Sequence, residues 1–418
     1  MEKIVIEGSH QLKGEVQISG AKNAVLPIMA ASLLVEGETK IKRVPDLRDT
    51  RTMANLLKMV GAKINFHNDT MSIDAASVDN PVAPYDLVKK MRASFYVLGP
   101  LIARFGQATV SMPGGCAWGP RPVDYHLKGL GKLGAKIDLA GGDIIARTKK
   151  LIGNKIRFDF PSVGATGNIV MAAVMAEGET EISNAAKEPE IVQLCEFLVS
   201  MGATIKGIGT TKICIEGVDA LKPQEITVIP DRIEAGTFLI AGAALGEIIL
   251  KNTIPEHLSA IIEKLEDVGA TITINDTDIA VSRTNNIKAI DVSTAVFPGF
   301  ATDLQAQWIA LMTIANGSSI VTDTIYNDRF SHVPELNRLG ANITVEGNSA
   351  IVRGVDELLG AQVRSTDIRA SASLILAGLM AKGKTTISDV HHIDRGYENI
   401  EKKFAKLGAN IKRIDFDE

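Results

Sequence analysis

Cysteine is scarce in this sequence: three occur in 418 residues, an odd number set far apart. So few thiols exclude a disulfide-stapled fold and fit a protein of a reducing compartment. Long apolar runs are also missing, since no stretch approaches the length of a membrane-spanning helix. Residues 1–8 alternate like a strand and contain no apolar signal-peptide core, so we expect a cytoplasmic protein.

Basic clusters and cofactor motifs are equally rare. The formal net charge of −4, without any block rich in Lys and Arg, argues against a nucleic-acid-binding protein. The sequence has no GxGxxG turn, no P-loop motif and no His/Cys cluster with zinc spacing. We therefore expect neither a nucleotide cofactor nor a metal, and nothing in the sequence indicates an obligate protein partner.

The sequence does contain one short motif that occurs six times, called the phrase below. The phrase is Gly-Ala-x-Ile, with Lys, Thr or Asn at x, and it starts at Gly61, Gly134, Gly202, Gly269, Gly340 and Gly408. Spacings of 67 to 73 residues indicate one supersecondary unit repeated along the chain. Each phrase follows an amphipathic helical stretch and precedes an alternating strand, so its glycine is the expected helix C-cap.

Ala-rich helical stretches lie elsewhere in the repeats. Those at 237–245, 308–315 and 371–380 are apolar nearly all round, which is typical of helices buried inside a domain. We therefore predict an α/β fold of two domains. Each domain has three α+β units of two helices and about four strands, with helices inside and sheets outside.

One loop interrupts the repeats and carries a thiol. Residues 113–122 include three glycines and three prolines, which rules out a regular element there. Cys116 has a cation, Arg121, five residues on; a nearby cation favours the thiolate, whereas a bound anionic substrate would keep the thiol protonated and able to donate. The alternative is a loop cysteine without a role. Cys195 and Cys214 follow helix and strand patterns, and we expect both in the core.

Other candidate residues open helices. Lys22 follows a tight turn beside a helix start, which suits a phosphate contact; the alternative is a solvated surface lysine. Ser162, Val163 and Gly164 lead into a helix whose amides could receive a phosphate, or form an ordinary N-cap. Asp303 is a cap or a general base.

Two further stretches stand near the C-terminus. Asp367 and Arg369 lie two apart at the head of an Ala-rich helix. The adjacent His391 and His392 lack a third ligand with suitable spacing, which argues against a metal there.

Together these stretches resemble those of the enolpyruvyl transferases over essentially the whole chain, in the branch that acts on UDP-N-acetylglucosamine. The matching motifs are residues 19–23, the Gly-Gly-Cys loop with residues 121–124, and residues 162–166, 302–305, 367–373 and 392–398. The resemblance implies transfer of the enolpyruvyl group of phosphoenolpyruvate to the 3′-hydroxyl of UDP-N-acetylglucosamine, with release of phosphate. It places this reaction in peptidoglycan synthesis and involves no cofactor.

The resemblance also implies a fold. It is a two-domain inside-out α/β barrel of six βαββαβ units, three per domain. One domain would hold residues 21–229, including the Cys116 loop. The other would hold residues 230–418 and the first strand region, 1–20, joined by a double crossover.

Roles for single residues follow from the same resemblance. Cys116 would protonate the methylene carbon of phosphoenolpyruvate, form a covalent adduct with it, and react with epoxide inhibitors of the fosfomycin type. Asp303 would be the base near the sugar hydroxyl. Lys22, Arg121 and Arg395 would neutralise phosphate and carboxylate. The implied substrate contacts are Lys22, Asn23, Arg92, Arg121, Pro122, Val123, Asp124, Tyr125, Ser162, Val163, Gly164, Asp303, Ile325, Arg329, Asp367, Arg369 and Arg395. Because the cations come from distant repeats, we expect the site to form as the domains close on UDP-sugar.

Two alternatives remain open. One is 5-enolpyruvylshikimate-3-phosphate synthase, which shares the fold and the phosphoenolpyruvate chemistry; it lacks such a Gly-Gly-Cys loop, so Cys116 argues against it. The other is a catalytically silent paralogue that senses UDP-sugar, against which the unbroken set of Lys22, Cys116, Asp303 and Arg395 argues. Many family members carry a lysine two residues before Ser162, where this chain has Phe160, which indicates a separate subgroup.

Overall fold

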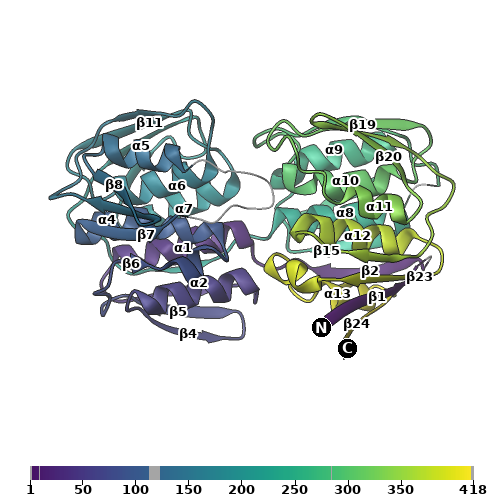
Figure 1. Ribbon diagram of the computed structural model, residues 1–418, viewed down its shortest axis with the longest axis horizontal. Coiled ribbons are helices and arrows are strands. Elements are labelled where there is room, and N and C mark those ends of the chain that lie inside the picture. Colours follow the sequence, from purple (N-terminus) through teal and green to yellow (C-terminus); the bar gives the residue numbers. More distant parts are fainter. Residues whose placement is uncertain (1, 9, 113–122, 284, 416–418) are drawn as a thin grey trace. The chain divides into compact units, whose positions relative to one another are not determined.

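The structure is a computed structural model that describes residues 2–8, 10–112, 123–283 and 285–415 (Figure 1). Two compact units make up the chain. Unit 1 comprises Met1–Ser19 and Pro230–Glu418, and unit 2 comprises Gly20–Ile229. The chain therefore passes from one unit to the other twice.

The strands of the described residues form six four-stranded sheets, three in each unit. In unit 2 the sheets are β14(Glu225–Thr227)-β3(Glu38–Lys42)-β5(Thr70–Asp74)-β4(Lys63–His67), β6(Val82–Ala83)-β7(Gln107–Ser111)-β9(Asp143–Arg147)-β8(Lys136–Ala140) and β10(Lys155–Arg157)-β11(Glu179–Ser183)-β13(Lys212–Glu216)-β12(Thr204–Lys206). In each of these sheets the first pair is parallel and the next two pairs are antiparallel.

Unit 1 has three sheets of the same kind. They are β22(Gln362–Arg364)-β23(Lys384–Ser388)-β1(Glu2–Glu7)-β24(Asn410–Asp415), β16(Thr271–Asn275)-β17(Asp278–Ser282)-β15(Gly246–Lys251)-β2(Leu12–Gln17) and β18(Val292–Ser293)-β19(Ser318–Thr322)-β21(Ser349–Arg353)-β20(Asn342–Glu346). The repeated sheet plan is the structural counterpart of the six-fold sequence repeat.

Apolar helices fill the interior of each unit (Figure 1). In unit 1 they are α8 (Arg232–Leu245), α10 (Gln305–Met312) and α12 (Ile368–Met380); in unit 2 they are α1 (Lys22–Ala31) with η1 (Ser32–Leu34), α4 (Leu98–Phe105) and α6 (Val163–Ala173). Every residue of α10 is buried, as is every residue of α8 after Arg232. The prediction that the Ala-rich helices lie inside is confirmed, and small side chains let them pack closely.

Amphipathic helices end at the repeated glycines. They are α2 (Arg48–Met59), α5 (Asp124–Lys132), α7 (Pro189–Ser200), α9 (Ser259–Val268), α11 (Val333–Arg338) and α13 (Ile400–Lys406). All six glycines have φ between 91° and 112°. An L side chain is strained there, which explains why glycine returns at this place in every repeat. The remaining short helices are α3 (Tyr85–Val88), η2 (Arg92–Val97), η3 (Pro255–Leu258), η4 (Thr302–Leu304) and η5 (Val390–Arg395).

The first two strands complete sheets whose other strands come from the second half of the chain. β1 lies between β23 and β24, antiparallel to both, and β2 runs parallel to β15. The purple strand β1 accordingly lies in one sheet with the yellow strands β23 and β24 in Figure 1. Ile4 and Ile6 are fully buried. Unit 1 is thus built from both ends of the sequence.

Main-chain hydrogen bonds fix the segments at each passage. In unit 1 the Asp231 amide donates to the Ser19 carbonyl at 2.9 Å, and in unit 2 the Ala21 amide donates to the Ile229 carbonyl at 2.7 Å. Gly20 approaches the main chain so closely that a Cβ would lie 1.9 Å from the Arg43 carbonyl oxygen. A glycine is therefore required two residues before Lys22.

Candidate active site

In unit 1 the predicted base, Asp303, lies in η4 between two arginines. Arg329 Nη2 is 2.9 Å from Oδ1, and Arg369 Nη2 is 2.7 Å from Oδ2. Burial alone would raise the pKa of Asp303, but the charges and hydrogen bonds of Arg369 and Arg329 outweigh it and hold the pKa well below the usual range. The three side chains carry one surplus positive charge, which suits an anionic substrate group.

Arg329 has a donor to spare. Its Nη1 donates to Thr302 Oγ1 at 3.0 Å, while its Nε is buried and finds no hydrogen-bond acceptor among the described residues. A buried donor without an acceptor is costly, so Nε is suited to a ligand oxygen.

Buried Asp323 organises the loop around Arg329. It accepts hydrogen bonds from Thr294 Oγ1 and Thr302 Oγ1 at 2.8 and 2.7 Å. It also accepts from the amides of Ile325 and Tyr326, both at 2.9 Å. Asp323 thus ties the segment of Ile325, a predicted substrate contact, to Thr302 of η4.

Asp367 and Arg395 occupy other helix ends of unit 1. Asp367 caps α12, because its Oδ1 accepts from the amides of Arg369 and Ala370 at 2.8 and 3.2 Å. This cap holds Arg369 in the first turn of α12, beside Asp303. Arg395 is the last residue of η5.

In unit 2, Lys22 is the first residue of α1 and is only 8% exposed. Its Nζ is 2.7 Å from Oδ2 of Asp49, in the first turn of α2. The interpretation of Lys22 as a solvated surface lysine is therefore wrong. A cation at a helix N-terminus opposes the helix dipole, and the buried carboxylate of Asp49 offsets that cost. The half-buried Asn23 follows in the same turn.

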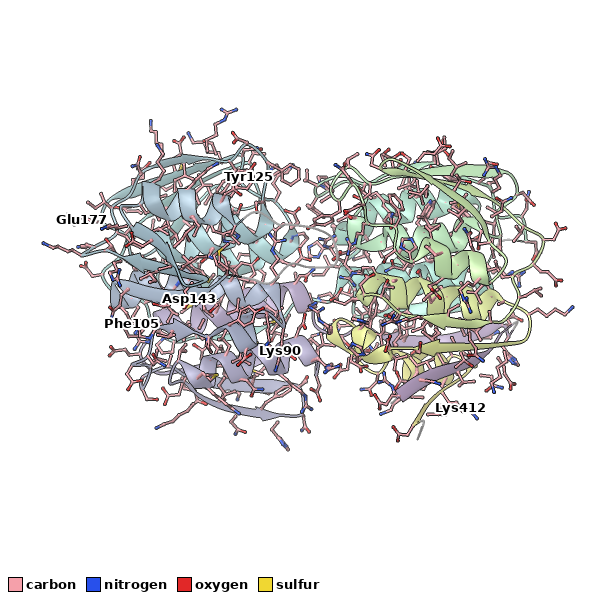
Figure 2. The ribbon with its side chains drawn as sticks, viewed as in Figure 1. Lys90, Phe105, Tyr125, Asp143, Glu177 and Lys412 are labelled. Carbon is pink, nitrogen blue, oxygen red and sulfur yellow. The ribbon has the colours of Figure 1, made fainter. Side chains whose placement is uncertain are left out.

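Val123, Asp124 and Tyr125 form the start of α5, as predicted for this stretch. Val123 is the N-cap residue, and Asp124 Oδ2 is 3.2 Å from Lys128 Nζ. Asp124 Oδ1 is buried without a hydrogen-bond donor among the described residues. Figure 2 labels Tyr125, whose ring centre is 6.0 Å from that of Phe158. The first turn of α5 thus contains both a carboxylate acceptor and an aromatic ring.

Ser162 is the N-cap of α6, where its Oγ accepts from the Ala165 amide at 3.3 Å. Val163 and Gly164 are the first two helical residues. Gly164 packs on His126 of α5, since a Cβ there would lie 3.2 Å from His126 Nε2. The ordinary N-cap is therefore present, and the anion site suggested for this turn stays a prediction.

His126 beneath α6 is neutral. Burial, with the charge of Arg92, lowers the pKa of His126 to about 3. Asn168 fixes its tautomer: Oδ1 accepts from the Gly99 amide at 2.6 Å, so Nδ2 donates to the Phe95 carbonyl at 2.9 Å and to His126 Nδ1 at 3.0 Å. The proton of His126 is therefore on Nε2, toward Gly164. Arg92, a predicted contact, begins η2 close to this cluster.

Three predicted residues, Cys116, Arg121 and Pro122, lie outside the described residues. Of the other thiols, Cys195 is buried in α7, and burial raises its pKa to about 12. Cys214 is half-buried. Its assignment to the core is wrong, because Ile213 and Ile215 take the inward positions of β13 and alternation turns Cys214 outward.

Comparison with known proteins identifies the family. Residues 6–404 match the family described as EPSP synthase (3-phosphoshikimate 1-carboxyvinyltransferase). The chain is 57% identical to UDP-N-acetylglucosamine 1-carboxyvinyltransferase of Chloroherpeton thalassium, over 100% of this chain and 98% of the relative. The chain belongs to the enolpyruvyl transferases. It is also 54% identical to the protein of the same name from Thermodesulfovibrio yellowstonii, over 99% of this chain and 100% of the relative.

Solved structures of other enolpyruvyl transferases show the same fold. The enolpyruvyl transferase NikO from Streptomyces tendae superposes with a TM-score of 0.89 at 24% identity, over 99% of this chain and 98% of that one. EPSP synthase from Acinetobacter baumannii gives a TM-score of 0.78 at 19% identity, over 99% and 100%. The predicted inside-out α/β architecture is thereby confirmed. No helix in the described part of this enolpyruvyl transferase is long and apolar enough to cross a membrane.

The sequence did not predict the residues that support the candidate site residues. They are Asp49, His126, Asn168, Asp323 and Tyr397. Each contacts a predicted residue, or the turn that contains one, from an element distant in sequence. Tyr397 lies within the motif at residues 392–398, but no local pattern indicated its contact with Arg369. Within the described ranges no group of three His, Cys, Asp or Glu side chains could hold a metal ion.

Proposed function

We propose that this enolpyruvyl transferase moves the enolpyruvyl group of phosphoenolpyruvate to the 3′-hydroxyl of UDP-N-acetylglucosamine and releases phosphate. The observation that carries the proposal is the pairing of Asp303 with Arg329 and Arg369. It combines an ionised carboxylate with two cations and a buried Nε donor. The names of relatives at 51–57% identity support the choice of the UDP-sugar as acceptor.

Anion binding divides among several cations. Arg329 and Arg369 receive the carboxylate of phosphoenolpyruvate, and Lys22, Arg121 and Arg395 receive its phosphate. The amide turn at Ser162 and the start of α5 at Asp124 serve the diphosphate and the nucleobase of the UDP-sugar.

Asp303 acts as a base only after Arg329 and Arg369 have bound the carboxylate of phosphoenolpyruvate. A carboxylate held by two guanidinium groups is a weak base, because both cations stabilise its ionised form. A substrate carboxylate that binds Arg329 and Arg369 competes with Asp303, which raises the pKa of Asp303 toward its ordinary value. Binding of phosphoenolpyruvate thus makes Asp303 a stronger base, and Asp303 then deprotonates the 3′-hydroxyl of the UDP-sugar.

The chemistry is an addition followed by an elimination. In the addition, the 3′-oxygen attacks C2 of phosphoenolpyruvate, the 3′-hydroxyl proton passes to Asp303, and the Cys116 thiol gives its proton to the methylene carbon. In the elimination, a base removes a proton from the new methyl group, the C=C bond re-forms, and the C2–O bond to phosphate breaks. Cys116 also forms a covalent adduct with phosphoenolpyruvate by adding its S–H across the C=C bond, so that sulfur bonds to C2 and the proton goes to the methylene carbon. With a fosfomycin-type epoxide the sulfur bonds to a ring carbon, a C–O bond of the epoxide breaks, and the oxygen takes up a proton.

We also propose the wider setting that the resemblance implies. The reaction takes place in the cytoplasm, in peptidoglycan synthesis. The two domains are residues 21–229 and residues 1–20 with 230–418, which the division at Ser19/Gly20 and Ile229/Pro230 supports.

Phosphate release tests the function. We expect release that requires both phosphoenolpyruvate and UDP-N-acetylglucosamine. Release with shikimate 3-phosphate in place of the UDP-sugar would instead indicate an EPSP synthase. Stabilisation against heat by UDP-N-acetylglucosamine, without any phosphate release, would indicate a UDP-sugar sensor.

A further inference from the structure

A buried tyrosine, Tyr397, lies against the first two turns of the three inner helices of unit 1. It is 2% exposed. Gln307 Nε2 of α10 and Arg369 Nη1 of α12 donate to its hydroxyl oxygen at 3.0 and 3.3 Å, and Thr237 Oγ1 of α8 is 2.9 Å away. One hydroxyl group therefore connects α8, α10 and α12.

The direction of each hydrogen bond follows from counting protons. Thr237 Oγ1 uses its single proton on the Ile233 carbonyl at 2.8 Å. Tyr397 must therefore donate its proton to Thr237. The Tyr397 oxygen accepts from Arg369 and from Gln307, whose two Nε2 protons are shared among Tyr397, the Asp303 carbonyl and, at 3.2 Å, Thr237 Oγ1. Burial raises the pKa of Tyr397, so the hydroxyl keeps the proton that this arrangement needs.

Tyr397 and Asp303 hold Arg369 at two points. The guanidinium donates through Nη1 to Tyr397 and through Nη2 to Asp303, and its central carbon is 5.7 Å from the Tyr397 ring centre. Two anchors on different nitrogens fix the plane of a guanidinium group. Gln307 Nε2 also donates to the Asp303 carbonyl at 3.0 Å, which ties the backbone of the base to the same hydroxyl.

The segment that carries Arg395 is tightly packed next to Tyr397. The amides of Gly396 and Tyr397 donate to the Ile393 carbonyl at 3.0 and 2.9 Å. A Cβ at Gly396 would lie 2.6 Å from Ile368 Cγ2, so this segment reaches the start of α12 only because residue 396 is glycine. Arg395 therefore lies two residues before the buried Tyr397, in a segment that packs closely against the start of α12.

We propose that Tyr397 is a positioning residue for enolpyruvyl transfer, whose hydroxyl orients Arg369, and through its own segment Arg395, toward the anionic groups of phosphoenolpyruvate. The inference rests on the proposed function. Ring packing alone does not give this role, because phenylalanine would fill the same volume without an acceptor for Arg369 or Gln307.

Tyr397→Phe tests the proposal. We expect kcat/KM for phosphoenolpyruvate to fall about tenfold to hundredfold, as for loss of a hydrogen bond to a charged group. We expect the KM for UDP-N-acetylglucosamine and the melting temperature to stay close to parent values. Thr313→Val is the matched control. It removes a buried hydroxyl group that donates to the Ala310 carbonyl at 2.6 Å, at the opposite end of α10 from Gln307. It should behave like the parent protein.

The outcomes separate the two claims. A parent protein without phosphate release means that the proposed function fails, and this inference falls with it. An active parent with an unchanged Tyr397→Phe variant overturns the inference alone. So does an equal loss for both substrates with a lowered melting temperature, which marks a merely structural role.

A second variant covers a failure of Tyr397→Phe to fold. Thr237→Val leaves Tyr397 in place but removes the acceptor of its proton. It should show the same selective loss for phosphoenolpyruvate at a smaller size, and parent-like kinetics of Thr237→Val would then overturn the inference.

Discussion

The charged side chains proposed to meet substrate already have internal partners. Lys22 is paired with Asp49, and Asp303 with Arg329 and Arg369. Forming a buried ion pair costs desolvation energy. Removing one member strongly destabilises the folded protein, because the other member remains as a buried charge without its partner. An anionic substrate must therefore compete with a carboxylate for each of these cations. Stability and substrate affinity are coupled at these residues, and paired variants can separate them.

Lys22→Ala should weaken phosphoenolpyruvate use far more than UDP-sugar binding. It should also lower the free energy of unfolding by about 3 kcal/mol, because Asp49 keeps a buried charge without this partner. The double variant Lys22→Ala/Asp49→Asn should regain most of the stability and none of the activity. Titration of each ligand and urea unfolding measure both effects. Equal affinity losses for the two ligands would refute the assignment of Lys22.

Asp303→Asn should lower the free energy of unfolding by about 3 kcal/mol, since two mostly buried arginines lose their counter-charge. A depressed folded-state pKa adds stability that is fully present above the unfolded-state pKa of about 4 and is lost as the pH falls below it. The difference between parent and variant should therefore be constant from about pH 5 to pH 8 in urea unfolding. A difference that changes within this range would show that Asp303 titrates there.

Cys116→Ser should abolish most turnover, because a hydroxyl is a far weaker acid than a thiol. Cys116→Asp should retain activity and resist fosfomycin-type epoxides, since a carboxyl group beside bound anions can stay protonated and donate. Its rate should decline as the pH rises through the carboxyl pKa. A Cys116→Ser variant as fast as the parent protein in steady-state assays would exclude the thiol as the acid.

At the scale of single elements, helix starts carry most of the proposed site. α1, α5, α6, α12 and the η4–α10 pair each present a candidate residue in or just before the first turn. The sequence predicts such places well, because turn residues and caps are local signals. It could not predict that Asn168 fixes the His126 tautomer or that Asp49 neutralises Lys22, since these contacts join elements far apart in the chain.

The cap of α6 allows stability and binding to be separated. Ser162→Ala loses the cap bond and should cost about 1 kcal/mol of unfolding free energy. Ser162→Asp keeps a capping oxygen and should retain parent stability, but its charge should repel the diphosphate and weaken UDP-N-acetylglucosamine binding about tenfold or more. Calorimetric titration with parallel urea unfolding measures both. Parent-like binding by Ser162→Asp would place the diphosphate elsewhere.

At the scale of the whole molecule, the six-fold phrase predicts the unit and its buried helices. Periodicity alone does not say which strand completes which sheet. β14 joins β3 across most of unit 2, and β1 separates β23 from β24. Strand partners are set by contacts between distant repeats, and such contacts leave no local pattern in the sequence. The expectation that residues 1–20 join residues 230–418 came from the resemblance to a known family and not from the periodicity.

Deletion of residues 2–7 should disrupt unit 1 alone, because β1 hydrogen-bonds to both β23 and β24. Hydrogen–deuterium exchange should show lost protection in β22, β23 and β24, with β11 and β13 of unit 2 unchanged. Ile6→Ala keeps the strand but leaves a cavity, so its effect should be smaller and confined to unit 1. Faster exchange in β11 or β13 of the deletion variant would show that unit 2 depends on β1.

The location of β1 also sets an order of events on the ribosome. Ile4 pairs with Ile387 and Arg413, so nearly the whole protein must be synthesised before this first strand finds its neighbours. Unit 2 needs nothing beyond residue 229 and can close its sheets while translation continues. The nascent chain therefore carries an apolar, unpaired strand for most of its synthesis, a template for aggregation. The exposed charged residues Glu2 and Glu7 at the two ends of β1 oppose such aggregation until β23 and β24 have been synthesised.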